Sequence, residues 1–511
     1  MITWASDILA RPAHRRLFTA TAVLVLAALL LWPALFNGGL PLLFPDSLDY
    51  LTNGRDLLLG VTRPPGYAYA ILPLWRAAGG LPMGLWVIVV AQALLLAWLI
   101  HLTFSLTLGR PRDGTAAGWT LTAAPLLAGA STLPFLATWI MADALTAPTL
   151  LSASLLSLAW DVLRRGERVG LSLLLFAGAA SHQTHVAIAL AAGLLGLLLH
   201  LLTRAPGPAR LRGALLVLLL SLSAVGTVVA LNRVVHGQAD TAQASPAFLL
   251  ARLVGDDLVA PYAAALCAER PAMPFCRRPG WLGPGRSLDA LLWQGDSPIW
   301  LDYGGIERVR NDASWIARRV LPLEWRPALS RGLGRAARLL TTPADPDLDL
   351  RPMAEPMLRE VASQTPELLA PILASAQLSG AIVRNPVVHL APPIALGAAG
   401  LLVPVSLLRR RGSFVGGLGA LVLAGMVTNA LVVGLTAEAY GRYAARLSWL
   451  PLLVLLAAAA NWLHRRRHAK SLSDPHWAPT LCGKVPCSGS ERHSAMPFDC
   501  GRDGRGTSLA R

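Results

Sequence analysis

Apolar segments of about 20 residues recur along this chain, and they constrain its fold most strongly because a helix of that length crosses about 30 Å of hydrocarbon. Eight are clear, at residues 17–37, 84–106, 116–136, 140–160, 213–231, 387–407, 414–436 and 446–463. The stretch 170–202 is too long for one helix and is interrupted by Ser181-His182-Gln183-Thr184-His185, which predicts two short spans. With 54% hydrophobic and 14% charged residues, the chain is predicted to be an all-α polytopic membrane protein with about ten transmembrane helices.

The net charge of +16 is carried by arginine clusters at alternate ends of these spans. The clusters are Arg11, Arg15 and Arg16; Arg110 and Arg112; Arg164, Arg165 and Arg168; Arg204, Arg210 and Arg212; Arg409 to Arg411; and Arg465 to Arg467. With ten spans, all of them fall on one side of the membrane, as the positive-inside rule requires, and both termini are cytoplasmic. The charge therefore indicates orientation and not a nucleic-acid partner.

The first apolar segment follows a basic leader, but it is long and has no small-x-small site before Asn37, so we expect a retained helix and not a cleaved signal peptide. Lys470 and Lys484 are the only lysines among 45 basic residues, a bias typical of GC-rich bacterial coding. We therefore expect a multi-pass protein of a bacterial inner membrane, with periplasm on the far side.

The chain is predicted to have four parts. An N-terminal transmembrane module, 1–231, contains a first periplasmic loop at 38–83. The segment 232–385 is rich in arginine and acids and is predicted to be a mainly helical periplasmic domain. The C-terminal transmembrane helices occupy 386–463. The polar tail, 464–511, has no hydrophobic periodicity and is expected to be disordered in the cytoplasm.

Cysteines and an amphipathic stretch give further expectations for these parts. Cys267 and Cys276 are expected to form a disulfide in an oxidising periplasm. The stretch from Trp315 to Leu340 has apolar and arginine positions at helical spacing with a break at Pro322. It either lies against the bilayer or packs within the domain. The tail cysteines, which we expect to be free thiols, are Cys482, Cys487 and Cys500.

The first periplasmic loop places acids, an arginine and a rigid turn directly after a hydrophobic span. Asp46 and Asp49 are three residues apart, so both carboxylates would project from nearly the same face of a helix. Asp46 could instead be only an N-terminal cap or a first-turn charge. Arg63 and Tyr67 flank Pro64-Pro65-Gly66, a turn that fixes the backbone where a polar site needs rigidity. We predict a reaction site at this membrane surface.

Three other periplasmic turns carry candidate residues. Asp143 begins a predicted span, where an acid is costly unless it is solvated or paired. Arg442 and Tyr443 precede the last span, where the positive-inside rule disfavours arginine, so an anionic ligand for Arg442 is indicated. Tyr443 could be only an interfacial anchor. His182 and His185 could bind a metal or shuttle a proton, and ordinary hydrogen bonding is the alternative.

These motifs resemble the GT-C superfamily of polytopic glycosyltransferases, which use polyprenyl-phosphate-linked sugars and include aminoarabinose-transferase-like and mannosyltransferase-like members. Phe44-Pro45-Asp46-Ser47-Leu48-Asp49 stands where those enzymes carry an acidic motif, and Arg63-Pro64-Pro65-Gly66-Tyr67 looks like the sequence that follows it. Asp143 matches a second acid, and Arg442-Tyr443 matches an Arg-Tyr pair before a late helix. The family's first acids are often adjacent or one apart, so of the pair here only Asp46 is carried over.

The resemblance implies roles for these residues. Asp46 and Asp143 are the candidate catalytic residues, with Asp46 as a base or a metal ligand and Asp143 orienting the acceptor or completing a cation site. Arg63 and Arg442 would hold the phosphate. A divalent cation, Mg or Mn, is optional in this superfamily, and Asp46 and Asp143 are its candidate ligands. The candidate substrate-binding residues are Asp49, Arg63, Tyr67, His182, Arg442 and Tyr443.

The function expected from the resemblance is transfer of a sugar from a polyprenyl-phosphate-linked donor to a periplasmic or cell-envelope acceptor, which could be a glycan, a lipid or a protein. The chain has no Gly-rich phosphate loop and no nucleophile elbow, which favours a lipid-linked donor over a nucleotide sugar. A transporter or flippase of lipid-linked saccharides, or a non-catalytic membrane assembly protein, would suit the same residues. The acids gather at one surface and no internal repeat is seen, which favours an enzyme.

Overall fold

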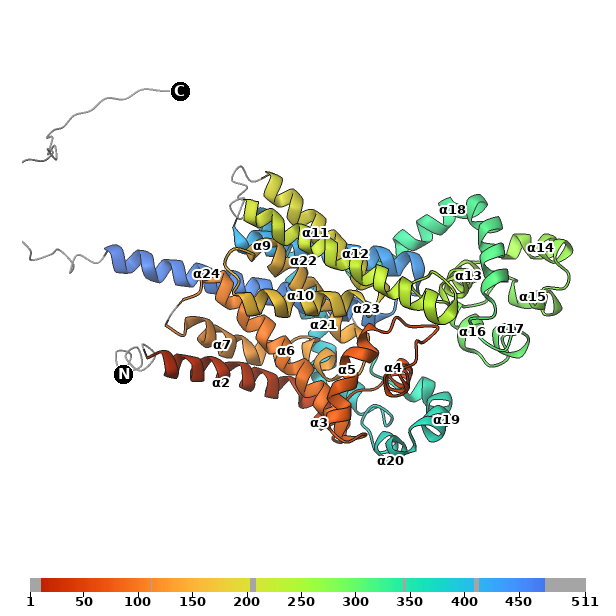
Figure 1. The fold of residues 1–511 in the computed structure, drawn as a ribbon, viewed down its shortest axis with the longest axis horizontal. Coiled ribbons are helices and arrows are strands. Elements are labelled where there is room, and N and C mark those ends of the chain that lie inside the picture. The colour runs from red at the N-terminus through yellow and green to blue at the C-terminus, as the bar shows by residue number, and fades with distance from the viewer. Residues whose placement is uncertain (1–10, 112, 203–207, 343–345, 409–412, 474–511) are drawn as a thin grey trace, which may run out of the picture. The chain divides into compact units, whose positions relative to one another are not determined.

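Figure 1 shows the computed structural model of this protein, which is built from helices. The structure describes residues 11–111, 113–202, 208–342, 346–408 and 413–473. Within these ranges the one β-type pairing is an isolated bridge between Leu42 and Trp139. Eight helices are long and apolar enough to cross a membrane: Pro12–Phe36, Met83–Thr107, Ala142–Ala159, Gln183–Leu202, Leu211–His236, Pro386–Ser406, Phe414–Thr436 and Gly441–Arg467. The protein is therefore a multi-pass membrane protein.

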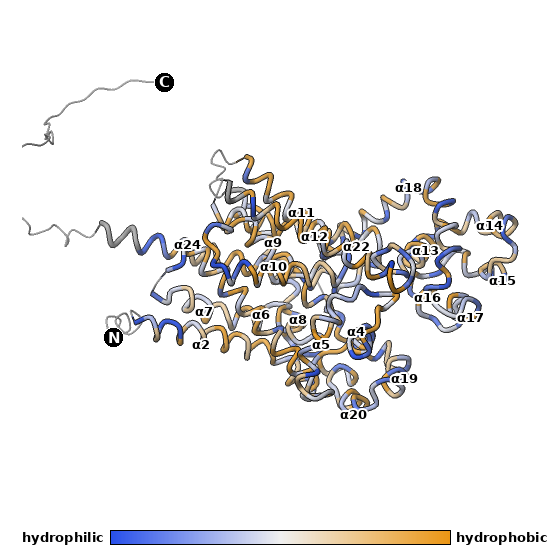
Figure 2. Tube along the Cα trace, viewed as in Figure 1, coloured by the Kyte–Doolittle hydropathy of each residue, from blue (hydrophilic) through white to orange (hydrophobic). Residues whose placement is uncertain are grey.

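The N-terminal module contains the helices that carry most of the apolar segments. Its elements are α2 Pro12–Leu30, α3 Trp32–Phe36, α4 Pro45–Asp56, α5 Gly66–Ala77, α6 Met83–Thr107, α7 Thr115–Gly129, α8 Leu133–Thr138, η1 Ala142–Leu145, α9 Thr146–Ala159, α10 Arg165–Ala179, α11 Gln183–Leu202 and α12 Pro208–His236. In Figure 2, α2, α6, α11 and α12 are hydrophobic along most of their length. Uninterrupted apolar surface on long helices is what lipid contact requires.

The predicted span 116–136 is not one helix, which corrects the sequence reading. The chain leaves the helix after α7 and resumes with α8, and Pro134 stands near the start of α8. Ser131 bridges the break, because its hydroxyl donates to Leu127 O at 2.5 Å and accepts from the Leu133 N–H at 3.2 Å. Side-chain oxygens can satisfy backbone groups freed by a helix break inside a membrane protein. Thr132 meanwhile donates to Ala445 O at 2.8 Å, which ties the break to the last helices.

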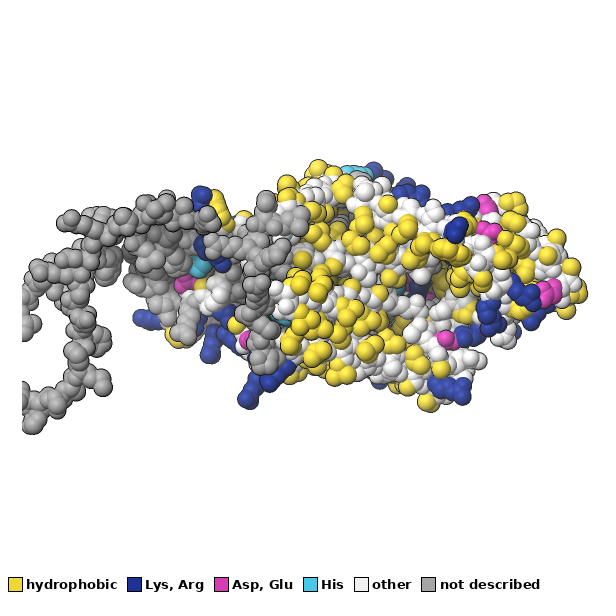
Figure 3. Space-filling view, turned by 90° about the horizontal axis from the view of Figure 1, so that it is seen from above, with side chains coloured by type: hydrophobic (Ala, Val, Ile, Leu, Met, Phe, Trp, Pro, Cys, Tyr) yellow, Lys and Arg dark blue, Asp and Glu magenta, His cyan; other side chains and the backbone are white. Residues whose placement is uncertain are grey.

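The segment after α12 is also helical, as the sequence predicts. Its elements are α13 Ser245–Gly255, η2 Ala260–Tyr262, α14 Ala263–Glu269, α15 Pro274–Arg277, η3 Pro279–Trp281, α16 Leu288–Trp293, α17 Pro298–Leu301, α18 Arg310–Thr341, η4 Arg351–Met353, α19 Ala354–Gln364, η5 Pro366–Leu368, α20 Leu369–Leu373 and η6 Ile382–Arg384. Cys267 and Cys276 form a disulfide with a Cα–Cα distance of 5.3 Å. Figure 3 shows charged side chains gathered over this part and hydrophobic ones over the transmembrane helices.

This segment divides into two packing units. Residues between Ala244 and Val320 form a hydrophobic core of their own. Residues between Leu348 and Ile382 instead belong to the same core as the N-terminal module. Gln377 anchors this second part, because its side-chain oxygen accepts from the Leu43 N–H at 3.0 Å and its amide donates to Leu43 O at 2.9 Å. The chain that follows the first span is therefore fixed by a residue more than 300 positions away.

The amphipathic stretch predicted from Trp315 to Leu340 lies within α18. This helix has non-helical backbone angles at Glu324, between Pro322 and Pro327, because proline removes backbone hydrogen bonds. It packs against α13 and α22. On its outer side Leu323, Trp325 and other large apolar side chains remain exposed.

The C-terminal helices complete the bundle. They are α21 Pro386–Leu408, α22 Phe414–Thr436, α23 Gly441–Ser448 and α24 Leu450–Ser473. The tail from 474 to 511, with its three predicted free cysteines, and the arginines at 409 to 411 lie outside the described residues.

Candidate functional site

The first loop builds one side of the site from α4. Pro45 starts this helix, and the Ser47 hydroxyl accepts from the Phe44 N–H at 2.9 Å, so the cap does not use Asp46. Asp46 lies in the first turn, where a negative charge also suits the helix dipole. Its carboxylate pairs with the Arg63 guanidinium at 2.5 Å. Two of the residues singled out in the sequence thus form a short ion pair across this loop.

Gly66 brings Arg63 against the turn between α10 and α11. The Gly66 N–H donates to Ala180 O at 3.1 Å. A Cβ atom at Gly66 would meet the backbone of Ala180 and Ser181 at 2.4 to 2.6 Å, closer than any real side chain approaches. The glycine of the Pro-Pro-Gly turn is therefore required for close backbone approach. That approach places Arg63 within electrostatic range of His182.

The bridge between Leu42 and Trp139 joins the first loop to the segment that carries Asp143. The Leu42 N–H donates to Thr138 O at 2.9 Å, and the Ile140 N–H donates to Leu42 O at 3.0 Å. Two residues far apart in the chain, Asp46 and Asp143, are thereby brought to the same end of the helices. A short piece of β pairing in a helical protein is what aligns the two loops.

Asp143 forms a buried ion pair with Arg446, four residues beyond Arg442. Arg446 Nη1 donates to Asp143 Oδ1 at 3.0 Å. Its other nitrogens donate to Asn429 Oδ1 at 2.5 and 3.0 Å and to Thr184 Oγ1 at 3.0 Å. Arg446 is 0% exposed and Asp143 is 3% exposed. A pair with this many partners fixes the local structure, and little of the Asp143 carboxylate is open to a ligand.

Arg442 differs because its guanidinium forms no ion pair within 4.0 Å among the residues that the structure describes, although its backbone N–H donates to Asp347 Oδ2 at 3.2 Å. Its guanidinium carbon lies 4.1 Å from the centre of the Phe44 ring, 5.0 Å from that of Tyr443 and 5.2 Å from that of Tyr440. Its Nη2 donates to the Tyr443 hydroxyl at 3.2 Å, while Nε is buried without a hydrogen-bond partner. Arg442 is only 8% exposed, so it is a buried cation held by aromatic faces.

Electrostatic interactions join these pieces into one cluster. Arg442 interacts with both Asp46 and Asp143. Tyr50 interacts with Arg63 and with the same two acids. The acids and arginines predicted from three separate loops therefore converge, together with Arg446, which the sequence reading did not select.

The two histidines have different surroundings. His185 is fully buried and uses both ring nitrogens, Nε2 with Thr146 Oγ1 at 2.6 Å and Nδ1 with Gly178 O at 2.9 Å. His182 Nδ1 accepts from the Thr184 N–H at 3.2 Å, and its ring is partly exposed. Burial lowers the pKa of His182 well below its usual value, and the positive charge of Arg446 adds to this. His182 is therefore neutral at pH 7 and able to accept or donate a hydrogen bond.

Tyr67 supports the site from behind. Its hydroxyl donates to Gln92 Oε1 at 2.8 Å, and its ring packs edge-on against Tyr50 at 5.1 Å between ring centres. The Gln92 amide in turn donates to Ala137 O and Trp139 O, both at 3.1 Å. Tyr67 is almost fully buried, and these contacts order the loop.

Two further acids lie beside Asp46. Burial raises the pKa of the Asp49 carboxyl above its usual value, and Arg63 offsets only part of this. Glu360, from α19, also has a raised pKa, because it is partly buried and the charges of Asp49 and Asp46 lie near it. No local motif around Glu360 in the sequence marks it as part of this cluster.

The residues do not fit the optional divalent cation. Among the described residues there is no group of three His, Cys, Asp or Glu side chains placed to hold a metal ion. The two candidate ligands are each directed at an arginine, Asp46 at Arg63 and Asp143 at Arg446. We therefore derive no chemical step through a metal.

An apolar cavity of about 210 Å³ adjoins the cluster. It lies between α10, α11 and α12, and its wall includes Pro64, Ala179, His182, Val186, Val225 and Val228. Pro64 follows Arg63 directly, and His182 interacts electrostatically with Asp143 and Arg63. Two residues of its wall, Pro64 and His182, are therefore close to the charged residues.

The fold and these residues define a multi-pass membrane protein with an arginine- and acid-lined site at one end of its helices. No family model matches the chain, and no curated protein matches it. Among solved structures, the chain is similar to ArnT from Cupriavidus metallidurans bound to undecaprenyl phosphate, with 18% identity over 85% of this chain and 77% of that one, and a TM-score of 0.30.

Proposed function

We propose that this protein is a GT-C-type glycosyltransferase that moves a sugar from a polyprenyl-phosphate-linked donor to a periplasmic or cell-envelope acceptor. The observation that carries the proposal is Arg442, a buried guanidinium without a carboxylate partner among the described residues. Burying a charge that has no ion pair is costly, so such a residue calls for an anion in the functional state. A phosphate matches the planar donor geometry of arginine.

The surroundings of Arg442 support a lipid-linked phosphate. The apolar cavity beside Pro64 and His182 offers a path for a hydrocarbon chain from the bilayer. Its wall includes His182 and the neighbour of Arg63, Pro64. A substrate with an apolar tail and a phosphate head could place its tail in the apolar cavity and its phosphate near the charged residues.

The proposed step is displacement at the anomeric carbon of the donor sugar. The acceptor hydroxyl oxygen bonds to that carbon, the bond from the carbon to the phosphate oxygen breaks, and polyprenyl phosphate leaves with the electron pair. The hydroxyl proton passes to the Asp46 carboxylate. Arg63 and Arg442 stabilise the charge that develops on the leaving phosphate.

The ion pair between Asp46 and Arg63 suits this step. In the absence of substrate, each neutralises the other at 2.5 Å. A bound phosphate would compete for Arg63 and leave Asp46 freer to accept a proton. We assign Asp143 the role of orienting Arg446 on α23, the helix that also carries Arg442, and Asn429 of α22 and Thr184 of α11 bind the same arginine. The residues that we expect to contact the sugar or the acceptor are Asp49, Tyr443 and His182.

The proposed location is a bacterial inner membrane, with both termini in the cytoplasm and the site on the periplasmic side. If ten helical segments cross the membrane, the loops that carry Asp46, Asp143, His182 and Arg442 all lie on one side, and the joining of these same loops in one cluster supports this. The segments α7 and α10 are 15 residues long, shorter than the eight candidate spans, which have 18 residues or more, and the arrangement requires both to cross. Crossing with short helices is tolerated where neighbours cover the helix ends.

The proposal is tested with purified protein in liposomes and a panel of synthetic undecaprenyl-phosphate-linked pentoses and hexoses. Release of undecaprenyl phosphate and labelling of cell-envelope extract are measured. We expect Asp46→Asn and Arg63→Ala to reduce the rate about 100-fold or more, as loss of a base or an oxyanion contact does. Arg359→Ala, on the exposed surface of α19, is the matched arginine control. Full activity of both site variants would contradict the proposal, and movement of lipid-linked sugar across the membrane without any product would identify a transporter instead.

A further inference from the structure

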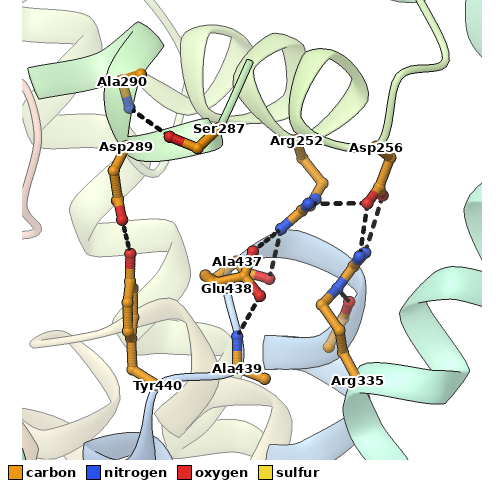
Figure 4. Close-up of polar contacts among 11 residues, drawn as sticks. Arg252, Asp256, Ser287, Asp289, Ala290, Arg335, Ala437, Glu438, Ala439 and Tyr440 are labelled. Atoms are coloured by element: carbon orange, nitrogen blue, oxygen red, sulfur yellow. Dashed lines mark hydrogen bonds and ion pairs between the residues drawn. The ribbon is translucent and has the colours of Figure 1, made fainter. Parts of the chain in front are cut away.

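A charged network outside the site holds the turn that leads into Arg442. This turn, residues 437–440, joins α22 to α23 and ends two residues before Arg442. Figure 4 shows the side chains that reach it from the periplasmic segment. They are Arg252 of α13, Arg335 of α18 and Asp289 of α16.

Two arginines bind the end of α22 and the start of the turn. Arg252 Nη1 donates to Glu438 Oε2 at 2.8 Å and, more weakly, to Ala437 O at 3.4 Å. Arg335 Nε donates to Gly434 O at 2.8 Å. Helix C-termini present unpaired carbonyls and a partial negative charge, which cations stabilise. The end of α22 is therefore capped by side chains from another part of the chain.

Asp256 links the two arginines to each other. It accepts from Arg252 Nη2 at 2.8 Å and from Arg335 Nη1 and Nη2 at 2.7 and 3.1 Å. All three residues are about 95% buried. The fork of Arg335 on Asp256 fixes direction as well as distance. Several linked ion pairs and hydrogen bonds therefore hold the turn, and not one flexible contact.

Close backbone packing lets Arg335 reach the turn. A Cβ atom at Gly434 would meet Gly332 O at 2.5 Å and Ala336 N at 2.7 Å. A Cβ at Gly332 would meet the Leu435 side chain at 2.6 Å. Two glycines facing each other bring α18 and α22 into backbone contact.

A second contact leads directly to the site. The Tyr440 hydroxyl donates to Asp289 Oδ2, and the Tyr440 ring stands 5.2 Å from the Arg442 guanidinium. One side chain therefore touches both the periplasmic segment and the anion-binding arginine. If this ring moved, one of the three aromatic rings that contact the Arg442 guanidinium would be displaced.

We propose that the core formed by residues 244–320 sets the position of Arg442 through a group of positioning residues. These are Arg252, Asp256, Arg335, Glu438, and Tyr440 with its hydrogen-bond partner Asp289. Buried ion networks are seldom more stable than apolar packing, so a network at this place is better explained by the geometry that it imposes. This inference rests on the proposed function, since it takes Arg442 to bind the lipid phosphate.

The test uses the full-length protein in detergent and undecaprenyl phosphate as the probe. Glu438→Gln and Tyr440→Phe are mild variants: the first keeps the shape of the side chain, and the second keeps the ring beside Arg442. We expect each to weaken binding 5- to 50-fold while the melting temperature stays within about 2 °C of the wild type. Asp302→Asn, which removes the exposed Arg278 pair of the same segment, is the matched control and should bind as the wild type does.

An Arg442→Ala background separates positioning from general structure. If the two residues act through Arg442, Glu438→Gln and Tyr440→Phe will have no further effect on binding once Arg442 is alanine. Equal losses in both backgrounds, or wild-type binding by both single variants, would overturn the inference. Should Arg442→Ala itself bind like the wild type, the proposed function fails first.

Discussion

Two groups of charges meet at the turn between α22 and α23, and they differ in how their arginines are paired. In the network of Arg252, Asp256, Arg335 and Glu438, every charge has an opposite partner at 3.1 Å or less. In the site, Arg442 has aromatic neighbours but no carboxylate within ion-pair distance among the described residues. The comparison teaches that a balanced network serves the fold, whereas an unbalanced cation leaves a place for a ligand.

The largest effect is expected when the balanced network loses its shared acid. Asp256→Ala leaves Arg252 and Arg335 buried with one carboxylate between them, and breaking such a group costs about 3–5 kcal/mol of unfolding free energy. Thermal unfolding in detergent measures this. Asp302→Ala, which removes the exposed pair with Arg278, is the control. If Asp256→Ala melts at the wild-type temperature, the paired network does not stabilise the fold and the contrast with Arg442 fails.

Arg442 should behave in the opposite way. Arg442→Ala removes an uncompensated buried charge, so stability should stay the same or rise, while undecaprenyl phosphate binding should weaken about 100-fold, within the 2–5 kcal/mol expected for a buried charged contact. Arg442→Lys should recover only part of the affinity, because lysine lacks the planar fork. Isothermal titration and thermal unfolding of the same samples separate the two quantities. A large loss of stability without loss of binding would place Arg442 with the structural network.

Gly66→Ala tests whether the site depends on backbone approach more than on charge. The added methyl would lie 2.4 Å from the Ala180 backbone, and relief of such a clash costs about 1–3 kcal/mol. Because Arg63 lies three residues before Gly66, we expect transfer activity to fall about 10-fold as the pair with Asp46 is displaced. Gly118→Ala, where a Cβ would meet nothing within 4 Å, is the control and should change neither activity nor stability. Unchanged activity in Gly66→Ala would show that the turn tolerates movement.

The smallest effect is expected at Asp49. Its pKa is raised by burial, so the ionised carboxylate destabilises the folded state at neutral pH, and this cost disappears as the pH falls below the usual value of 3.8. Asp49→Asn should therefore raise the melting temperature at pH 7, on the order of 1 °C, and the gain should shrink as the pH approaches 4. Melting curves recorded between pH 7 and pH 4 show whether the gain in melting temperature shrinks or grows as the pH falls. A gain that grows as the pH falls would contradict the raised pKa.

Much of the fold could be predicted because its signals are local. Each predicted span lies on helical structure, since apolar length and lipid thickness match within a single segment. The error at 116–136 arose from Ser131 and Pro134, where hydroxyl groups and a proline break a helix that hydropathy alone would continue. The partition of the segment 232–385 into two packing units also had no local signal, because it depends on which core each helix joins.

The site was predictable only in part. Asp46 and Arg63 share one loop, so their pairing lay within reach of sequence reasoning. Arg446 was not selected, although its spacing of four from Arg442 places both on one helix face. Its partner, Asp143, lies 303 residues earlier in the chain. Glu360 and Gln377 carry no motif at all.

The sequence by itself determined the helical membrane class, the candidate acids and arginines, and the loops in which they lie, because hydrophobic length and charge placement act within short stretches of chain. Only the tertiary structure decided which arginine is paired. Arg442 and Arg446 are alike in sequence, and the difference between them comes from Asp143, Asn429 and Thr184, which accept hydrogen bonds from the Arg446 guanidinium and not from that of Arg442. Pairing of buried charges depends on distances of a few ångströms between segments far apart in the chain, and those distances exist only once the helices have packed.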